Sequence, residues 1–228
     1  MQKNKRHFTL LEILIVLGII IVIVGLTTPA FSRLVIGSAV DQAGQMVSGQ
    51  LAIARGEAIA RRQCVALVMP GTSWTAEDDD ANKRCQAFRL ALVEEAGSTT
   101  YQFDKWLPGS EWTYLPNGAV IAQVTSEVPW GTDGELSRTG SSPDYEYTPT
   151  GTCSLSDNNQ LKYDADTNVR AVIFTPDGQA LNWTYITLMQ GVVPAHETSV
   201  KNANENNLFV LGVSPMTGKA TTLFPPAK

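Results

Sequence analysis

The residue that first suggests chemistry is Glu12, the single charged residue in an otherwise apolar run at residues 8–26. A carboxylate inside an apolar helix of membrane length costs about 2–3 kcal/mol unless it finds a partner. A plain membrane anchor gains nothing from that cost, so the acid predicts a specific interaction. If the chain is cut between His7 and Phe8, Phe8 carries a free amine. The carboxylate of one helix can then pair with the amine of a neighbouring helix.

Motifs for catalysis or for a cofactor are missing from the sequence. It has no G-x-S-x-G, no H-E-x-x-H and no glycine-rich phosphate loop, and only two histidines. Residues 164–168 imitate the start of a calcium loop, but Val169 and Thr175 replace the required Gly and Glu. The acidic run at 77–80 fits a solvated loop better than a calcium site, although the second interpretation stays open. We predict no enzyme, no cofactor and no resident metal.

The apolar run itself is long enough to cross a membrane. As a helix it reaches about 28 Å, close to the ~30 Å thickness of the hydrocarbon layer. The leader at 1–7 is basic, with Lys3, Lys5 and Arg6. The excess of positive charge before the segment predicts an N-terminus in the cytoplasm and an outward-facing remainder. A cleavable secretory signal peptide and an ordinary single-span anchor are the alternatives, and neither explains Glu12.

Helical periodicity continues beyond Pro29, a residue that usually kinks a helix. Between residues 31 and 63 apolar residues recur at steps of three, four and seven, which predicts one buried stripe: Val40, Val47, Leu51, Ala54 and Ala58. Several glycines weaken this half of the helix by about 1 kcal/mol each relative to alanine. We therefore expect the half to be held by packing against a sheet.

The order of a basic leader, a cleavage point and Phe8-Thr9-Leu10-Leu11-Glu12 before an apolar helix resembles the prepilin signature of type IV pilins and type II secretion pseudopilins. The resemblance implies that a prepilin peptidase removes the leader after His7 and methylates Phe8. It also implies that Glu12 pairs with a neighbouring subunit, and that Pro29 kinks the helix. His7 departs from the family, which usually has Gly before the cut.

The rest of the chain has the composition of β-strands. Short strands are predicted at 64–69 and 86–95, where Phe88, Leu90 and Leu92 share one face. We predict a hairpin at 170–188 around the turn Thr175-Pro176-Asp177-Gly178, and a last strand at 208–213. The Phe174-to-Ala180 pattern, the helix-to-strand junction before Cys64 and the Leu115-Pro116-x-Gly118-x-Val120 segment resemble minor pseudopilins of the GspH/FimT type.

Three cysteines, Cys64, Cys85 and Cys153, lie on the outward side of the predicted span, where disulfides are permitted. At most one internal pair can form. A regular hairpin of 64–69 and 86–95 would place Cys64 and Cys85 at opposite ends, too far apart for a bridge. Cys153 can approach either of them, so the pairing, or the absence of any disulfide, stays open.

The predicted fold class is α+β, a long N-terminal helix packed on a C-terminal antiparallel β-sheet domain. The expected segments are a leader (1–7), a transmembrane helix (8–30), an amphipathic continuation (31–63) and an extracytoplasmic β-rich domain (64–228). The last contains an insertion at about 126–160, rich in Gly, Ser, Thr, Pro and Asp.

The predicted function is that of a minor pseudopilin or pilin-like structural subunit in the inner membrane, with the C-terminal domain outside. The implied partners are other pilin or pseudopilin subunits, the prepilin peptidase, the inner-membrane assembly platform and the lipid bilayer. The net charge of −5 argues against nucleic acid as a partner. The alternatives are a membrane-anchored periplasmic binding or receptor module and a DNA-uptake minor pilin.

Overall fold

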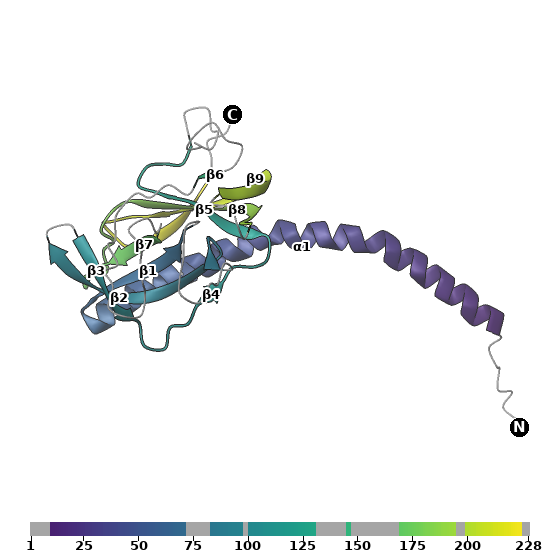
Figure 1. Ribbon diagram of the computed structural model, residues 1–228, viewed down its shortest axis with the longest axis horizontal. Coiled ribbons are helices and arrows are strands. Elements are labelled where there is room, and N and C mark those ends of the chain that lie inside the picture. The colour runs from purple at the N-terminus through teal and green to yellow at the C-terminus, as the bar shows by residue number, and fades with distance from the viewer. Residues whose placement is uncertain are drawn as a thin grey trace, which may run out of the picture. The chain divides into compact units, whose positions relative to one another are not determined.

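The structure is a computed structural model that describes residues 10–71, 83–97, 100–130, 145–146, 169–194 and 199–224. The chain divides into two compact units, Met1–Ser38 and Ala39–Lys228. A single helix, α1 (Leu10–Arg61), contributes its first half to the first unit and its second half to the other (Figure 1). The helix passes through Pro29 without interruption, as expected, whereas the kink at Pro29 stays a prediction.

All the strands of the described residues belong to the second unit. They are β1 (Cys64–Pro70), β2 (Ala87–Gly97), β3 (Thr100–Trp106), β4 (Thr113–Tyr114), β5 (Ala119–Thr125), β6 (Tyr145–Glu146), β7 (Val169–Phe174), β8 (Thr184–Val192), β9 (Ser199–Val213) and β10 (Ala220–Leu223). Together with α1 they give the α+β class that the sequence predicts. The strand β10 has no counterpart among the predicted strands.

The strands pair antiparallel throughout the described residues, but they form two sheets rather than one. The first sheet has the order β3-β2-β1-β7, with β4 added beside β2. The second has the order β10-β9-β8-β5, with β6 added beside β9. Each sheet turns one face to the same core, so two sheets bury more of the helix than one could.

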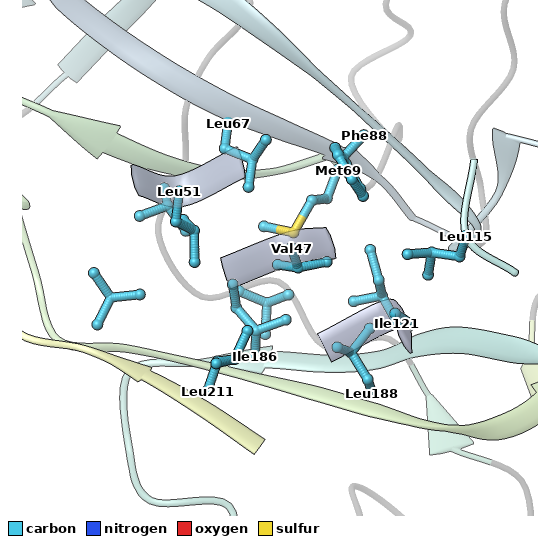
Figure 2. Close-up of a cluster of buried hydrophobic side chains, with 14 of the residues drawn as sticks. Val47, Leu51, Leu67, Met69, Phe88, Leu115, Ile121, Ile186, Leu188 and Leu211 are labelled. Carbon is cyan, nitrogen blue, oxygen red and sulfur yellow. The ribbon is translucent and has the colours of Figure 1, made fainter. Parts of the chain in front are cut away.

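The core lies around the second half of α1. The predicted stripe of Val40, Val47, Leu51, Ala54 and Ala58 is confirmed, because all five side chains are at most 1% exposed. Figure 2 shows Val47 and Leu51 between the two sheets. One sheet contributes Leu67, Met69 and Phe88, and the other contributes Ile121, Ile186, Leu188 and Leu211. The predicted inward face of Phe88, Leu90 and Leu92 is also confirmed.

The hairpin predicted at 170–188 is wrong beyond its turn. The turn forms, since Gly178 N donates to Thr175 O at 2.8 Å and Phe174 bridges Ala180. The two strands then part, because β7 pairs with β1 while β8 pairs with β5 and β9. A turn signal and alternation describe each strand locally, whereas the choice of partner strand depends on which sheet buries its apolar side chains.

The region predicted as an insertion at 126–160 is described only in part. It contributes the two-residue strand β6, which pairs with Ser199 and Val200 of β9. Residues 131–144 and 147–160 lie outside the described residues, as do the acidic run at 77–80 and the calcium-like sequence at 164–168.

Candidate functional site

Glu12 lies in the first turn of α1, surrounded by apolar side chains. An open hollow beside it is lined by Glu12, Ile13, Val16 and Leu17. Residues 12, 13, 16 and 17 fall on one side of a helix because 12 and 16, like 13 and 17, are four positions apart. The carboxylate therefore lies at the edge of an apolar surface and is the only ionisable side chain among residues 10–25.

The apolar side chains of this half of α1 are exposed on every side. Within Leu10–Val24 the exposed fraction of the large apolar side chains runs from 49% at Ile20 to 81% at Leu10. A helix that is apolar all round is stable where an apolar environment or neighbouring helices cover it. Its exposure in a single chain therefore indicates a surface made for another contact.

Among the described residues, no helix meets both the length and the hydropathy that a membrane span requires. The membrane segment expected at residues 8–30 stays a prediction. His7 and Phe8, the expected cleavage site, lie outside the described residues. Of the predicted assembly residues, the structure thus places only Glu12 and Pro29, both in the helical part of the first unit.

In the second unit, Gly44 allows a strand to approach α1 closely. A Cβ added to Gly44 would lie 2.7 Å from Cγ of Phe209 on β9, closer than real Cβ contacts occur. A Cβ added to Gly49, one and a half turns further on, would meet nothing within 4 Å. The glycines that looked like weak points of the helix therefore include one that packing requires.

Near its end α1 also holds two turns through Arg55, a role that the sequence analysis missed. Arg55 Nε donates to Gly178 O at 3.0 Å. The turn before β8 and the turn before β10 touch, because Ala180 N donates to Pro215 O at 3.2 Å. Gly178 and Gly218 both have positive φ, which glycine adopts without strain. The sequence shows a glycine in each turn but nothing that links either turn to Arg55.

Cys64 and Cys85 lie at opposite ends of the strand pair. Cys64 faces Val93 across β1 and β2, whereas Cys85 N donates to Pro70 O at the other end. Both thiols are free, and Cys153 lies outside the described residues, so its pairing stays open. Burial raises the pKa of the Cys85 thiol far above its usual range, although Arg170 and Arg84 act in the opposite direction. It also raises the pKa of Cys64, with smaller effects of Glu95 and Asp177.

The other face of the first sheet carries an aromatic cluster. Trp106 contacts Phe103 and Trp112 edge to face, with ring centroids 4.9 and 5.2 Å apart. The guanidinium of Arg89 lies 4.7 Å above the Trp106 ring, and its Nε donates to Ser110 O. The cluster packs against a small apolar core formed by Ala66, Val68, Ala91, Val93, Phe103 and Ile173. These contacts indicate that the cluster stabilises this face of the sheet.

Within the part of the chain that the structure describes, no group of three His, Cys, Asp or Glu side chains could hold a metal ion. The candidate site is the apolar surface around Glu12 in the first unit. What this arrangement can do is associate with other apolar helices.

Comparison with known proteins agrees with the resemblance found in the sequence. A family model described as type II transport protein GspH matches residues 43–132. The pilin-like protein PilA1 of Thermus thermophilus is 37% identical over 109 residues, which cover 45% of this chain. The match spans 64% of the length of PilA1. These two matches confirm the predicted resemblance to pilin-like proteins and to the GspH type.

Two kinds of solved structure are also similar. The type IV minor pilin FimU of Pseudomonas aeruginosa has a TM-score of 0.41 and 13% identity, over 81% of this chain and 87% of FimU. The minor pseudopilin EpsH from the type 2 secretion system of Vibrio cholerae has a TM-score of 0.44 and 11% identity. The match extends over 83% of this chain and 99% of EpsH.

Proposed function

We propose that the chain is a minor pseudopilin or pilin-like structural subunit of a type II secretion pseudopilus or a type IV pilus. The observation that carries the proposal is the position of Glu12, the single acidic residue of a helical segment whose large apolar side chains from Leu10 to Val24 are exposed all round. The match of residues 43–132 to the GspH model supports the same assignment for the second unit. The activity is assembly rather than catalysis.

The apolar part of α1 is surrounded by two apolar environments, one before assembly and one after it. Before assembly, residues 8–30 lie in the inner membrane, with the basic leader in the cytoplasm and the β-rich domain outside. In the fibre, the same residues pack against the helices of other subunits. Both environments are apolar, so transfer between them costs little hydrophobic free energy.

Glu12 favours the fibre over the membrane, because only the fibre supplies a partner for its carboxylate. After the prepilin peptidase cuts between His7 and Phe8, the amine of Phe8 in one subunit pairs with the Glu12 carboxylate of its neighbour. A buried carboxylate is strongly destabilising when it is left without a partner, so the pair favours subunits in register. The kink at Pro29 and the assembly platform of the inner membrane belong to the same proposal.

The experiment that tests this proposal is mass analysis of the N-terminus of the full chain made in cells with an active prepilin peptidase. The expected N-terminus is Phe8 carrying a methyl group. A chain with His7→Gly, which restores the residue that the family usually has before the cut, should be processed at least as completely. An intact Met1 in both chains would contradict the proposal, and Phe8 in the second chain alone would show that His7 blocks cleavage.

A further inference from the structure

The outermost strand of the second sheet, β10, differs from the other outermost strands of the described residues. The pairing of β3 with β2 is irregular at two positions, and β3 carries Asp104 and Lys105. The strand β5 is irregular between Ile121 and Gln123 and is almost wholly buried, and β7 is covered as well. Proteins usually protect sheet edges by such irregularities, charges or cover.

Among the described residues β10 shows no irregularity and no charge, and its one protection is its length of four residues, the shortest of these outermost strands. Its pairing with β9 is regular, its sequence Ala-Thr-Thr-Leu has no charge and no proline, and Thr221 and Thr222 are exposed. In the order β10-β9-β8-β5, the described strands give it a neighbour on one side only. A regular, uncharged and exposed edge is a template for one more strand.

The hydrogen-bonding pattern identifies which backbone groups face the open side. Ser214 N donates to Lys219 O at 3.1 Å, so the carbonyl of Lys219 faces β9. In an antiparallel ladder hydrogen-bonded pairs alternate with pairs that do not bond each other. From the register Thr221↔Gly212 and Leu223↔Val210, the N–H and C=O groups of Ala220 and Thr222 therefore point away from β9.

An apolar surface adjoins this edge on the face of the sheet away from α1. Tyr185 Cε1 and Leu223 Cδ1 lie 3.4 and 2.8 Å from the position that a Cβ on Gly212 would take, so both side chains close over this glycine. Trp183 stacks on Tyr185, with centroids 6.1 Å apart and planes 8° from parallel. Phe224, directly after β10, is 80% exposed.

We propose that β10 receives an extended segment of another protein as a further strand of the second sheet. The chemistry of the edge defines that segment. Its central residues are uncharged, its backbone N–H and C=O groups bond those of Ala220 and Thr222, and an aliphatic side chain lies beside Leu223. Alternate side chains supply the specificity, and the backbone supplies the affinity.

A second copy of this chain is a poorer occupant. Two copies of β10 that pair antiparallel are related by a two-fold axis perpendicular to the sheet. The half of α1 that packs on the sheet would then run in opposite directions in the two copies. Chains anchored in one membrane, as under the proposed function, point the same way. This step alone rests on the proposed function.

The test uses the full chain in detergent micelles and a fluorescent peptide, Lys-Thr-Val-Thr-Val-Thr-Lys, with Lys-Thr-Pro-Thr-Pro-Thr-Lys as the control. Thr222→Pro removes the outward N–H and leaves the ladder to β9 intact, so its melting temperature should match the wild type. Thr222→Val keeps the N–H. We expect saturable binding of the first peptide, weakened about tenfold or more by Thr222→Pro and less than about twofold by Thr222→Val.

Hydrogen exchange on the same samples locates the peptide. Exchange of the Thr222 amide should slow when the first peptide is added and stay unchanged with the control. Equal binding to Thr222→Pro, absence of saturable binding, or protection elsewhere with a fast Thr222 amide would each overturn the proposal. So would a wild-type dimer abolished by Thr222→Pro, because it would assign the edge to a second copy. None of these outcomes bears on processing at Phe8.

Discussion

The two halves of α1 have the same backbone and opposite surroundings. In Leu10–Val24 large aliphatic residues are exposed on all sides, whereas beyond Ala39 a narrow stripe is buried and the other positions face outward. The buried stripe includes the small residues Ala54 and Ala58, and at Gly44 the side chain of Phe209 on β9 comes close. Both halves are therefore helical, and they differ in the size and spacing of their apolar side chains.

This difference shows what each half is built to contact. The second half meets rigid sheets of its own chain, so each position must fit a particular neighbour. Under the proposed function, the first half meets a partner that its own chain does not supply, so apolar bulk all round suits it, and Glu12 selects among apolar environments. Substitutions should therefore affect stability in one half and assembly in the other.

Replacing each of three glycines by alanine should show the largest difference in stability between the two halves. Gly44→Ala places a methyl group against Phe209 and should lower the free energy of unfolding by up to about 3 kcal/mol. Gly49→Ala meets nothing and should raise it by about 1 kcal/mol through helix propensity. Gly18→Ala, in the first half, should leave it unchanged. Urea unfolding of the full chain in micelles, followed by tryptophan fluorescence, measures all three.

Tryptophan is a suitable probe because α1 contains none, so the signal reports on the second unit alone. A second substitution serves as the control for the clash. Phe209→Ala in the Gly44→Ala background should recover part of the lost free energy of unfolding, so the effects of the two substitutions should be non-additive. Equal losses for Gly44→Ala and Gly49→Ala would show that close packing against β9 is not what distinguishes the second half.

Arg55 and Arg61 offer a smaller effect within the second half. Arg55→Ala removes the hydrogen bond to Gly178 O and should cost about 1.5 kcal/mol. Arg61→Ala removes an exposed ion pair with Glu57 and should cost less than about 0.5 kcal/mol. The same urea titration compares them. If Arg61→Ala proved the more damaging, the two turns would not depend on Arg55.

The cysteines should have the smallest effect, visible mainly as a pH dependence. Because burial raises the pKa of the folded-state Cys85 thiol, its contribution to stability is fully present below about pH 8.5 and is lost as pH rises further. In the native chain Cys85 should react with iodoacetamide at least about a hundredfold more slowly than in urea. Cys64, half-buried, should react sooner. Peptide mapping of alkylated chains after timed exposure would reveal the opposite order if the burial were wrong.

The sequence predicted what depends on local pattern. Local spacing of apolar and turn residues was enough to predict three features: the stripe from Val40 to Ala58, the strands beginning at Cys64 and before Glu95, and the turn at Pro176. It also singled out Glu12, since a lone acid in an apolar run is visible without a structure.

The sequence could not predict what depends on contacts between distant residues. The parting of β7 and β8 into different sheets follows from which apolar side chains reach the core, not from the turn that joins the strands. The need for Gly44 follows from Phe209, and the role of Arg55 from Gly178, each more than a hundred positions away. An isolated acid in an apolar run is visible in the sequence, whereas the long-range contacts of Gly44 and Arg55 are not.

The most direct test of the account is the assembly of Glu12 variants. Glu12→Leu removes both the charge and its desolvation cost, and Glu12→Gln keeps the size of the side chain without the charge. The measurement is the amount of chain in sheared fibres or crosslinked complexes relative to the amount in the membrane. We predict that both variants reach the membrane and lose their leader as the wild type does, yet assemble at least about tenfold less. Glu12→Leu assembling as well as the wild type would contradict the pairing with Phe8, and with it the proposed mechanism.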